Sequence, residues 1–476
     1  MRFLKWPLQI SERRNLLAIG DLLLVNGAVV FALWIWTLRD PRLSFSLPFI
    51  LSQIHWFLIL TPLWLLSASL NDFYNLKLAA DLRSVWLVLL RITGLVFLIY
   101  VAAYFVSPRQ SLPRGVVLYH CAATFVSVSA WRTIYGVLLG HSFFRRRAMV
   151  IGAGQAGRAI VQAIEENLPS EYQLVGYIDD DPSKQGQVIE GVPIIGSRWD
   201  LPSLVKEKDV SEIILASSAR SLTVAAHTVR GELIRAIMDC QEQGVQITLM
   251  PLLYEEITGR VPVEHVGDDW SLVLPLGHAA IGSFWPFFKR TMDILISGLG
   301  LIILALLFPI LALAIYIDSP GPIFYTQERV GKGGRIFRLF KFRSMIPNAE
   351  ESGAVWAEEN DPRVTRVGRF LRCTMIDELP QIINVLRGEM SIVGPRPERP
   401  IFAHQLAAQI PFYRARHAVK PGMAGWALIN YGYSSSVRDA LVKLQYDLYY
   451  IKRQSIYLDL LILAKTIGAM ISFKGR

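Results

Sequence analysis

The sequence predicts a membrane protein of the α/β class with three parts. Four transmembrane helices are expected in residues 1–140, a parallel α/β domain in 141–276 and a basic domain in 277–476. A hydrophobic content of 52% and 12 tryptophans are more apolar than an ordinary soluble protein. A glycine-rich turn between a strand-like and a helix-like segment indicates the middle domain. An arginine-rich block around two adjacent carboxylates indicates the third part.

Four apolar segments predict the N-terminal helices, and each has about the 20 residues that a bilayer requires. They lie near residues 16–38, 49–70, 84–106 and 115–139. A basic start precedes the first segment and no small-residue cleavage site follows it, so we expect a retained anchor. Four crossings return the chain to its starting side, and the arginines at 145–147 favour a cytoplasmic N-terminus and exit.

A few polar side chains interrupt these apolar segments. So few of them favour helix–helix contacts, or side chains that reach the membrane surface, over a transport path. They are Asp21, Asn26, His55, Arg91 and Arg132.

Residues 148–275 predict a Rossmann-like α/β domain. The segment AMVIGAGQAGRAIVQAI has the pattern of a strand, a glycine-rich turn and a helix, and LVGYIDDD supplies a second strand. Residues 212–218 and 245–251 predict later parallel strands, with helix between them.

The glycine-rich turn is a candidate nucleotide site. Gly152, Gly154 and Gly157 have GxGxxG spacing, and Asp179 follows 22 residues after the last glycine, where dinucleotide folds place a ribose-binding acid. NAD(P) or another nucleotide is one interpretation, and tight packing of a helix on a strand without a ligand is the other. A Tyr-x-x-x-Lys pair, expected of a short-chain sugar-nucleotide epimerase or dehydratase, occurs nowhere in the chain. We therefore interpret the domain as regulatory or structural.

Residues 294–317 form an apolar run without a charge, which by length alone predicts a fifth span. Pro309 interrupts this run, and the sequence beyond it is strongly basic. A complete crossing would place the basic domain and the α/β domain on opposite sides of the membrane. We therefore predict a re-entrant helix near residues 288–318, hinged at Phe308–Pro309, that enters and leaves the same leaflet.

Residues 361–398 contain the candidate chemistry. Arginine forks suit phosphate oxygens, and a carboxylate pair suits a divalent metal or nucleophilic attack. This mixture predicts chemistry on a phosphate ester. The carboxylates are Asp377 and Glu378, and the surrounding arginines are Arg363, Arg366, Arg369, Arg372, Arg387 and Arg396.

The local pattern around the carboxylates predicts one helix. Thr374, with an acid three residues later, is typical of an N-cap, and an apolar stripe then continues to Gly388. Asp377 and Glu378 would lie in the first turn, where the helix dipole keeps carboxylates ionised. Such an acid is more often only a cap, and the surrounding motifs are what favour a catalytic role here.

Four long motifs occur in order in the C-terminal part. They resemble those of the bacterial polyprenyl-phosphate phosphoglycosyl transferases, in the large membrane-anchored subfamily that starts exopolysaccharide and O-antigen synthesis. The resemblance extends from about Phe284 to the end, and it implies a monotopic catalytic domain with a re-entrant helix. The motifs are FYTQERVGKGGRIFRLFKFRSM (324–345), DPRVTRVGRFLR (361–372), DELPQIINVLRGEMSIVGPRP (377–397) and KPGMAGW (420–426).

The resemblance also implies a reaction and its residues. Asp377 would attack the sugar-proximal phosphorus of a UDP-sugar, UMP would leave, and polyprenyl (undecaprenyl) phosphate would take the phosphosugar from the aspartyl intermediate. Glu378 is implied as a catalytic residue and Mg²⁺ ligand, and Arg396 as a nucleotide contact. The other candidate substrate-binding residues are Pro395, Pro397, Lys341, Arg343, Arg369 and Arg387.

One position departs from the family pattern. Many relatives have glutamine two residues after the tryptophan of KPGMAGW, where this chain has Leu428. Glucose or galactose 1-phosphate is the starting expectation, and no single relative's sugar is carried over. The expected setting is the cytoplasmic face of the bacterial inner membrane, with a UDP-sugar, polyprenyl phosphate, the lipid bilayer and a second copy of the chain in a homodimer as partners.

Two other basic segments are expected to have simpler roles. GKGG joins two strands of a predicted hairpin and lacks Walker spacing, so it is predicted to be a turn. Arg414, Arg416 and Lys420 form either a solvated face or a grip for phosphates or anionic lipid headgroups. The last segment is apolar along one side and predicts a helix on the membrane surface.

Two other functional classes remain as alternatives. A membrane-tethered nucleotide-sensing scaffold without transferase activity would use the carboxylate pair only as a cap, and the intact DELP, PRP and KFRSM motifs argue against it. A nucleic-acid-binding regulator is suggested only by the net charge of +10, without a recognition helix, so no nucleic acid is expected. Cys121, Cys240 and Cys373 lie far apart and predict neither disulfides nor a zinc site.

Overall fold

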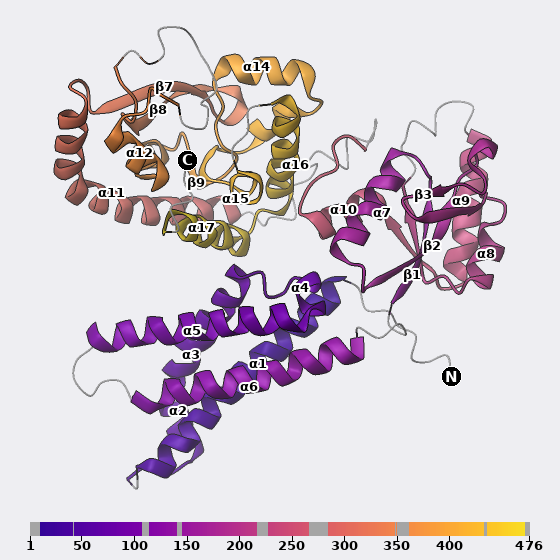
Figure 1. The fold of residues 1–476 in the computed structure, drawn as a ribbon, viewed down its shortest axis with the longest axis horizontal. Helices are drawn as coiled ribbons and strands as arrows, with labels where there is room; N and C mark the ends of the chain where they lie inside the picture. Colours follow the sequence, from indigo (N-terminus) through magenta and orange to yellow (C-terminus); the bar gives the residue numbers. More distant parts are fainter. Residues whose placement is uncertain are drawn as a thin grey trace. The chain divides into compact units, whose positions relative to one another are not determined.

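The computed structural model describes nine parts of the chain, which are residues 10–40, 42–106, 114–139, 145–216, 227–265, 284–347, 349, 361–432 and 436–471. The chain divides into two compact units. One comprises Met1–Ser217 with Ser221–Thr258, and the other Ser218–Arg220 with Gly259–Arg476 (Figure 1).

Four long helices form the N-terminal part, in agreement with the positions of the four predicted spans. They are α1 (Ile10–Arg39), α3 (Ile54–Leu70), α5 (Leu82–Val106) and α6 (Arg114–Leu139), with the short helices α2 (Leu47–Ser52) and α4 (Leu76–Ala80) between them. The second predicted span is divided, because α2 ends one residue before Gln53 and α3 begins after it. Among the described residues, α1, α5 and the later helix α11 (Trp285–Asp318) are long and apolar enough to cross a membrane, and α3 is a shorter apolar helix. Helix α6, at the position of the fourth predicted span, is not among them.

Polar side chains join these helices. Arg132 of α6 pairs with Asp21 of α1, both fully buried, and its guanidinium lies 4.1 Å from the ring centroid of Phe73. Thr61 of α3 donates a hydrogen bond of 3.1 Å to Asn26 of α1. The expectation of helix–helix contacts is confirmed at these positions, because a buried charge or amide in apolar surroundings requires a partner.

The middle domain contains a six-stranded sheet, in agreement with the predicted Rossmann-like α/β domain. Strands β1 (Arg146–Ile151), β2 (Tyr172–Ile178), β4 (Val192–Gly196), β5 (Glu212–Leu215) and β6 (Gln246–Leu249) are parallel, and β3 (Val188–Ile189) adds an antiparallel edge. The strand predicted over 245–251 is shorter than expected, because α10 (Met250–Thr258) begins directly after it. Residues 217 and 218 of another predicted strand lie outside the described residues.

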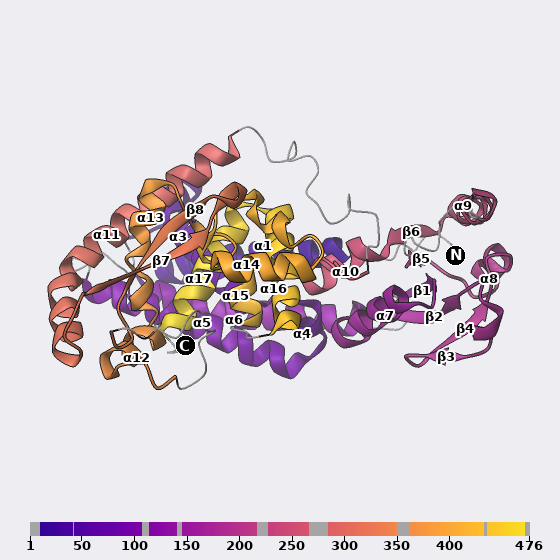
Figure 2. The ribbon, with the colours of Figure 1, turned by 90° about the horizontal axis from the view of Figure 1, so that it is seen from above.

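Alternation along the central strand explains why helices cover both faces of this sheet. Ala148 and Val150 of β1 pack with α7 (Gln155–Asn167) and α10, whereas Met149 and Ile151 pack with α8 (Leu201–Glu207) and α9 (His227–Glu242). Successive side chains of a strand point to opposite faces, so the apolar residues 148–151 of β1 need cover on both. Figure 2 shows α8 and α9 on one side of the sheet and α7 and α10 on the other.

The C-terminal unit is built on one long helix, α11 (Trp285–Asp318), which has Pro309 in its interior. Figure 1 shows that α11 is bent partway along its length, and a proline is the usual cause of such a kink. Large apolar side chains along it are exposed, among them Leu295, Leu306 and Ile310. The helix is therefore present where the re-entrant helix was predicted, and its path through the membrane stays a prediction.

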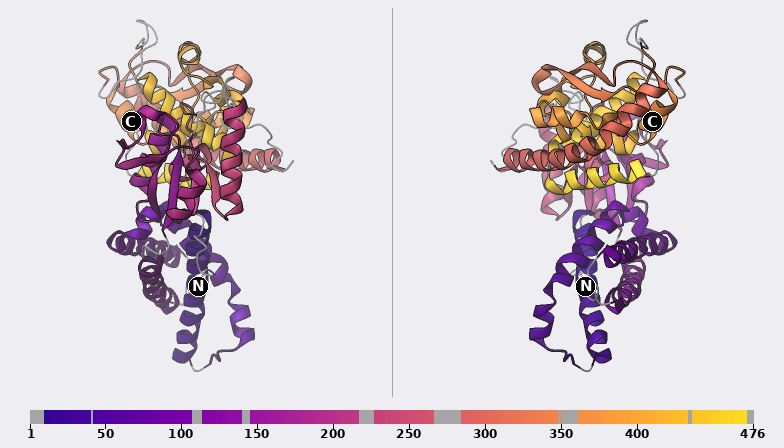
Figure 3. Two further views of the ribbon diagram at one scale, coloured as in Figure 1. Left: turned by 90° about the vertical axis from the view of Figure 1, so that its right-hand side faces the viewer. Right: turned by 90° about the vertical axis from the view of Figure 1, so that its left-hand side faces the viewer.

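Short elements pack around α11. They are the hairpin strands β7 (Phe324–Val330) and β8 (Ile336–Phe342), α12 (Arg366–Cys373), α13 (Gln381–Arg387), β9 (Ser391–Val393), α14 (Pro400–Gln409), β10 (Gly422–Ala424), α15 (Trp426–Tyr431), α16 (Val437–Arg453) and α17 (Ile456–Ile471). The predicted hairpin is confirmed, with Phe324 opposite Phe342 and Val330 opposite Ile336. The apolar helix α17 runs beside α11 (Figure 3) and is joined to it by an ion pair between Lys289 and Asp459.

We expect Gly157→Ala to destabilise the middle domain and Gly154→Ala to leave it unchanged. A Cβ atom at Gly157 would lie 2.0 Å from the carbonyl oxygen of Gly152, whereas one at Gly154 would meet nothing within 4 Å. Overpacking of this kind costs about 1–3 kcal/mol. The measurement is the thermal unfolding midpoint of the full chain in detergent, and equal midpoints for the two variants would contradict the close approach.

Candidate functional site

Asp377 and Glu378 lie in a 3₁₀ turn (Ile376–Glu378) between α12 and α13. The prediction of a single helix capped by Thr374 is wrong, because the Thr374 hydroxyl donates 2.8 Å back to the Phe370 carbonyl and ends α12. Met375 then adopts a left-handed conformation with φ of 58°, which breaks the helical path. The carboxylates are therefore presented on a turn that two short helices support.

Glu378 is held by two cations from distant segments. Lys341 Nζ of β8 lies 2.8 Å from Glu378 Oε1, and Arg396 donates to the same oxygen at 2.7 Å and to Oε2 at 3.3 Å. Burial opposes ionisation, but Arg396 and Lys341 outweigh it and hold the pKa of Glu378 below its usual range. This carboxylate is fixed in position and in its ionised form.

Asp377 has a different environment from its neighbour. It is 7% exposed, and in the part of the chain that the structure describes its carboxylate makes no hydrogen bond or ion pair. Burial raises its pKa above the usual value, Lys341 acts in the opposite direction and the Glu378 charge adds to the rise. The two carboxylates lie in a 3₁₀ turn and not in the first turn of the expected helix, so their ionisation is set by burial and by neighbouring charges. The charge of Glu378 is balanced by two cations, whereas the Asp377 carboxylate is buried and has no hydrogen-bond or ion-pair partner among the described residues.

The loop around Arg396 is fixed through its backbone. Four successive carbonyls, from Pro395 to Glu398, each accept a hydrogen bond of 2.9 Å. The donors are Gly422 N, the Arg416 guanidinium, the Arg329 guanidinium and Val330 N. Pro395 and Pro397 are buried on either side of Arg396, so the loop has little freedom and the guanidinium is preorganised toward Glu378.

Arg416 supports this loop from the interior. It pairs with Asp447 of α16 at 2.8 Å, donates to the Tyr413 hydroxyl at 2.6 Å and is only 7% exposed. A side chain so enclosed does not form the surface grip for phosphates that was one interpretation of this basic segment. Its role in the structure is to hold the Arg396 carbonyl.

Asn384 positions β8 and was not identified as a site residue from the sequence. Its side-chain oxygen accepts from Phe340 N at 3.1 Å, and its side-chain nitrogen donates to the Arg338 carbonyl at 2.7 Å. These bonds join α13 to the strand that carries Lys341. The sequence did contain a sign of this role, which is a single asparagine inside an apolar helical stripe. A fully buried amide must satisfy its hydrogen bonds, so such an asparagine is expected to bond to a neighbouring segment.

The remaining predicted substrate-binding residues that the structure describes make no hydrogen bond or ion pair with Glu378. Arg343 is buried, and its guanidinium donates to the Ser319 carbonyl at the end of α11. Arg369 is exposed on α12, and Arg387 is exposed with its guanidinium 5.0 Å from the Phe340 ring centroid. The structure thus brings together Lys341, Asp377, Glu378 and the loop from Pro395 to Pro397, but not the other three arginines.

The carboxylate pair is compatible with Mg²⁺. No group of three or more His, Cys, Asp or Glu side chains suited to a metal occurs among the described residues. Mg²⁺ commonly uses one or two carboxylates and takes its other ligands from water and substrate phosphates. Asp377 and Glu378 fit that donor set.

The predicted nucleotide site of the middle domain also assembles. Asp179 Oδ2 accepts from Ala153 N at 2.8 Å and pairs with Lys184 at 3.1 Å, and its Oδ1 accepts from Asp181 N at 3.0 Å. The acid expected to bind a ribose is therefore bonded to the glycine-rich turn itself. Gly157 packs against Gly152, as tight helix–strand packing requires, and binding of NAD(P) or another nucleotide stays a prediction.

Two known protein families match the chain, one in each of its two compact units. A family described as "Bacterial sugar transferase" matches residues 284–473, and one described as "CoA-binding domain" matches residues 69–251. The chain is 42% identical over 245 residues to the UDP-N-acetylgalactosamine-undecaprenyl-phosphate N-acetylgalactosaminephosphotransferase of Aeromonas hydrophila. That match covers 52% of this chain and 57% of the relative, so the chain spans little more than half of that protein.

Longer matches are found to two glucose-1-phosphate transferases. The UDP-glucose:undecaprenyl-phosphate glucose-1-phosphate transferase of Xanthomonas campestris pv. campestris is 32% identical over 384 residues, which cover 78% of this chain and 77% of the relative. The protein of the same description from Escherichia coli K12 is 31% identical over 354 residues, which cover 71% of this chain and 70% of the relative. Relatives with different named sugars therefore share these segments.

We expect Arg416→Met to destabilise the C-terminal unit strongly. Removal of the guanidinium leaves the buried Asp447 carboxylate without its ion pair, and breaking such a pair costs about 3–5 kcal/mol. The measurement is the thermal unfolding midpoint of the full chain in detergent. The double variant Arg416→Met/Asp447→Asn removes the unpaired charge and should regain part of the loss, and a double variant no more stable than the single one would contradict this account.

Proposed function

This chain belongs to the bacterial polyprenyl-phosphate phosphoglycosyl transferases, and we propose that it transfers a sugar 1-phosphate from a UDP-sugar to polyprenyl (undecaprenyl) phosphate. The products would be polyprenyl-diphospho-sugar and UMP, in the first membrane step of exopolysaccharide or O-antigen synthesis. The observation that supports the proposal best is the unengaged Asp377 carboxylate beside Glu378, which Lys341 and Arg396 hold.

The proposed first step is attack by Asp377 on the phosphorus that bears the sugar. A bond forms between the carboxylate oxygen and phosphorus, the bond from phosphorus to the UMP oxygen breaks, and UMP leaves with that electron pair. In the second step an oxygen of the lipid phosphate attacks the same phosphorus and releases the carboxylate. A covalent aspartyl-phosphosugar intermediate allows one site to serve a soluble donor and a lipid acceptor in turn.

Burial of Asp377 supports this role in two ways. A poorly solvated carboxylate with a raised pKa is a stronger nucleophile than one in water. The same burial limits the access of water, which would otherwise hydrolyse the acyl phosphate before the lipid arrives.

The cations around Glu378 match the charge of a diphosphate. Lys341 and Arg396 already bind a carboxylate at this place, and both side chains suit phosphate oxygens. Glu378 would hold Mg²⁺, which when bound supplies charge neutralisation for the leaving phosphate. Arg396 is fixed by its loop and would orient the nucleotide.

The bent apolar helix α11 supports a location at the membrane surface. Its exposed leucines and isoleucines suit an apolar medium, and Pro309 in its interior suits a helix that turns back within one leaflet. We propose that this re-entrant path places the active site at the height of the lipid phosphate on the cytoplasmic face.

The experiment is UMP release by the purified full chain with Mg²⁺ and undecaprenyl phosphate, across a panel of UDP-sugars that includes glucose, galactose and their N-acetyl forms. We expect release with one or two donors, and a fall to below about one-thousandth in Asp377→Asn because the nucleophile is lost. Glu328→Gln, which changes an exposed carboxylate of β7, is the matched control and should keep the activity.

Two outcomes would contradict the proposal. Release that persists in Asp377→Asn would remove Asp377 as the nucleophile. No release with any donor, from protein shown to be folded, would favour the nucleotide-sensing scaffold instead.

Removal of metal should abolish UMP release, and added Mg²⁺ should restore it. In Glu378→Gln the carboxylate that would hold the ion is lost, so we expect about 10²-fold slower release that higher Mg²⁺ recovers only in part. The measurement is the initial rate against Mg²⁺ concentration for wild type and variant. An unchanged rate after chelation would show that the two cations suffice without a metal.

A further inference from the structure

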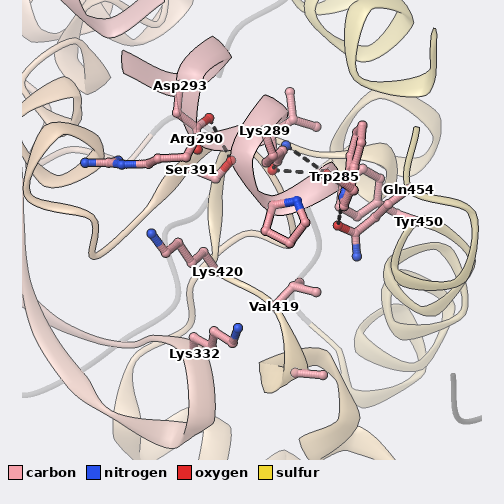
Figure 4. Close-up of a pocket in the computed structure, with 13 residues that line it drawn as sticks. Trp285, Lys289, Arg290, Asp293, Lys332, Ser391, Val419, Lys420, Tyr450 and Gln454 are labelled. Carbon is pink, nitrogen blue, oxygen red and sulfur yellow. Dashed lines mark hydrogen bonds between the residues drawn. The ribbon is translucent and has the colours of Figure 1, made fainter. Parts of the chain in front are cut away.

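A cavity of about 370 Å³ lies where α11 begins, in the C-terminal unit (Figure 4). One part of its wall is apolar and includes Trp285, Pro286, Val393 and Val419. The other part contains four cations and a single carboxylate, which are Lys289, Arg290, Lys332, Lys420 and Asp293.

Two of these cations form hydrogen bonds or ion pairs within the protein. Lys289 pairs with Asp459 and donates to the Val393 carbonyl at 2.9 Å. Arg290 donates to the carbonyls of Val385 and Leu386 at 2.7 and 2.8 Å, where α13 ends. Their hydrogen bonds explain why they are there.

The other two, Lys332 and Lys420, have no such explanation. Neither makes a hydrogen bond or an ion pair among the residues that the structure describes. Asp293 is fully buried and accepts from the Ser391 hydroxyl and from Ile392 N, both at 2.9 Å, so it does not pair with either lysine there. Figure 4 shows both lysine side chains at the cavity, below Arg290 and Ser391.

These cations also lie close to one another. A Cβ atom at Gly388 would lie 3.5 Å from Lys420 Nζ and 3.8 Å from the Arg290 guanidinium. Burial, followed by the charges of Arg290 and Lys332, lowers the pKa of Lys420, and Asp293 acts in the opposite direction. Like charges gathered in this way destabilise a fold unless an anion binds between them.

A second cavity of about 570 Å³ extends the basic surface. It shares Lys332 and Lys420 with the first and adds Arg335 and Arg387. Its acidic lining residue, Glu389, accepts a hydrogen bond of 2.7 Å from Asn384. The basic surface therefore continues past the two lysines, while the apolar wall lies on the side where α11 begins.

An anion that fits both the basic and the apolar wall of this cavity would carry a phosphate group and an apolar chain. Phe284, Phe287 and Phe288 at the start of α11 are exposed, which provides an apolar path next to Trp285 and Pro286. We propose that this cavity, the Lys332–Lys420 pocket, binds the phosphate headgroup of a membrane lipid, with the phosphate at the two lysines and the chain toward the start of α11. The lipid is either the polyprenyl phosphate acceptor or a bulk anionic phospholipid.

Native mass spectrometry of the full chain in detergent tests this site, with undecaprenyl phosphate, dioleoylphosphatidylglycerol, undecaprenol and inorganic phosphate as separate probes. We expect at least one lipid phosphate to bind, and Lys332→Gln/Lys420→Gln to weaken it about tenfold or more because two charged contacts are lost. Lys332→Arg/Lys420→Arg should keep most of the affinity. Arg438→Gln, an exposed cation of α16 outside both cavities, is the matched control.

The outcomes separate the two sources. Binding of undecaprenyl phosphate alone identifies the acceptor, and equal binding of phosphatidylglycerol identifies a general headgroup site. Equal affinity of the Gln double variant and Arg438→Gln would overturn the proposal. Undecaprenol or inorganic phosphate bound as tightly as the lipid phosphates would do so as well.

This inference relies on the proposed function only for the choice of polyprenyl phosphate as a probe. Binding is measured without a UDP-sugar, so it does not depend on the transfer reaction. If the transferase reaction fails, lysine-dependent lipid binding can still be observed, and if lipid binding fails, UMP release can still be measured with Asp377 intact.

Discussion

The ion-paired Glu378 is the interaction on which the rest of the site depends. Its carboxylate accepts from Lys341 of β8 and from Arg396 of the Pro-Arg-Pro loop, so three segments far apart in sequence meet at one side chain. A buried carboxylate would be costly alone, and these cations together outweigh the loss of hydration. The pairing also leaves Asp377 next to it without a partner among the described residues, which suits the nucleophilic role proposed for it.

Two buried polar side chains, outside the carboxylate pair itself, hold the segments that carry Lys341 and Arg396 in position. Asn384 joins α13 to β8 and thereby sets the position of Lys341, and Arg416 holds the carbonyl of Arg396 while it pairs with Asp447. Such groups are stable in the interior only when their hydrogen bonds are made, so each permits one arrangement of the segments it joins. The precision that phosphoryl transfer needs therefore depends on residues that need not contact the substrate.

Exposed apolar side chains and basic side chains occur together in the C-terminal unit. Helix α11 exposes apolar side chains, and its first turns supply Lys289 and Arg290 to the interior of the unit. Lys332 and Lys420 differ from these two because their charge is not used by the fold that the structure describes. The proposed lipid-phosphate site would account for them, since a phosphate headgroup can neutralise such charges.

The sequence by itself indicated the membrane class, the Rossmann-like domain and the β7–β8 hairpin, and its motifs named Asp377, Glu378, Lys341 and Arg396 among the candidate site residues, which the structure brings together. These depend on apolar length, on strand alternation and on motifs that lie within short stretches of chain. Only the tertiary structure decided that Thr374 ends a helix, that Arg343 and Arg416 serve the fold, and that Asp377 and Glu378 have opposite pKa shifts. The physical reason is that burial and ion pairing arise from segments brought together in space, such as β8 and the Arg396 loop, and neighbours in the chain do not specify them.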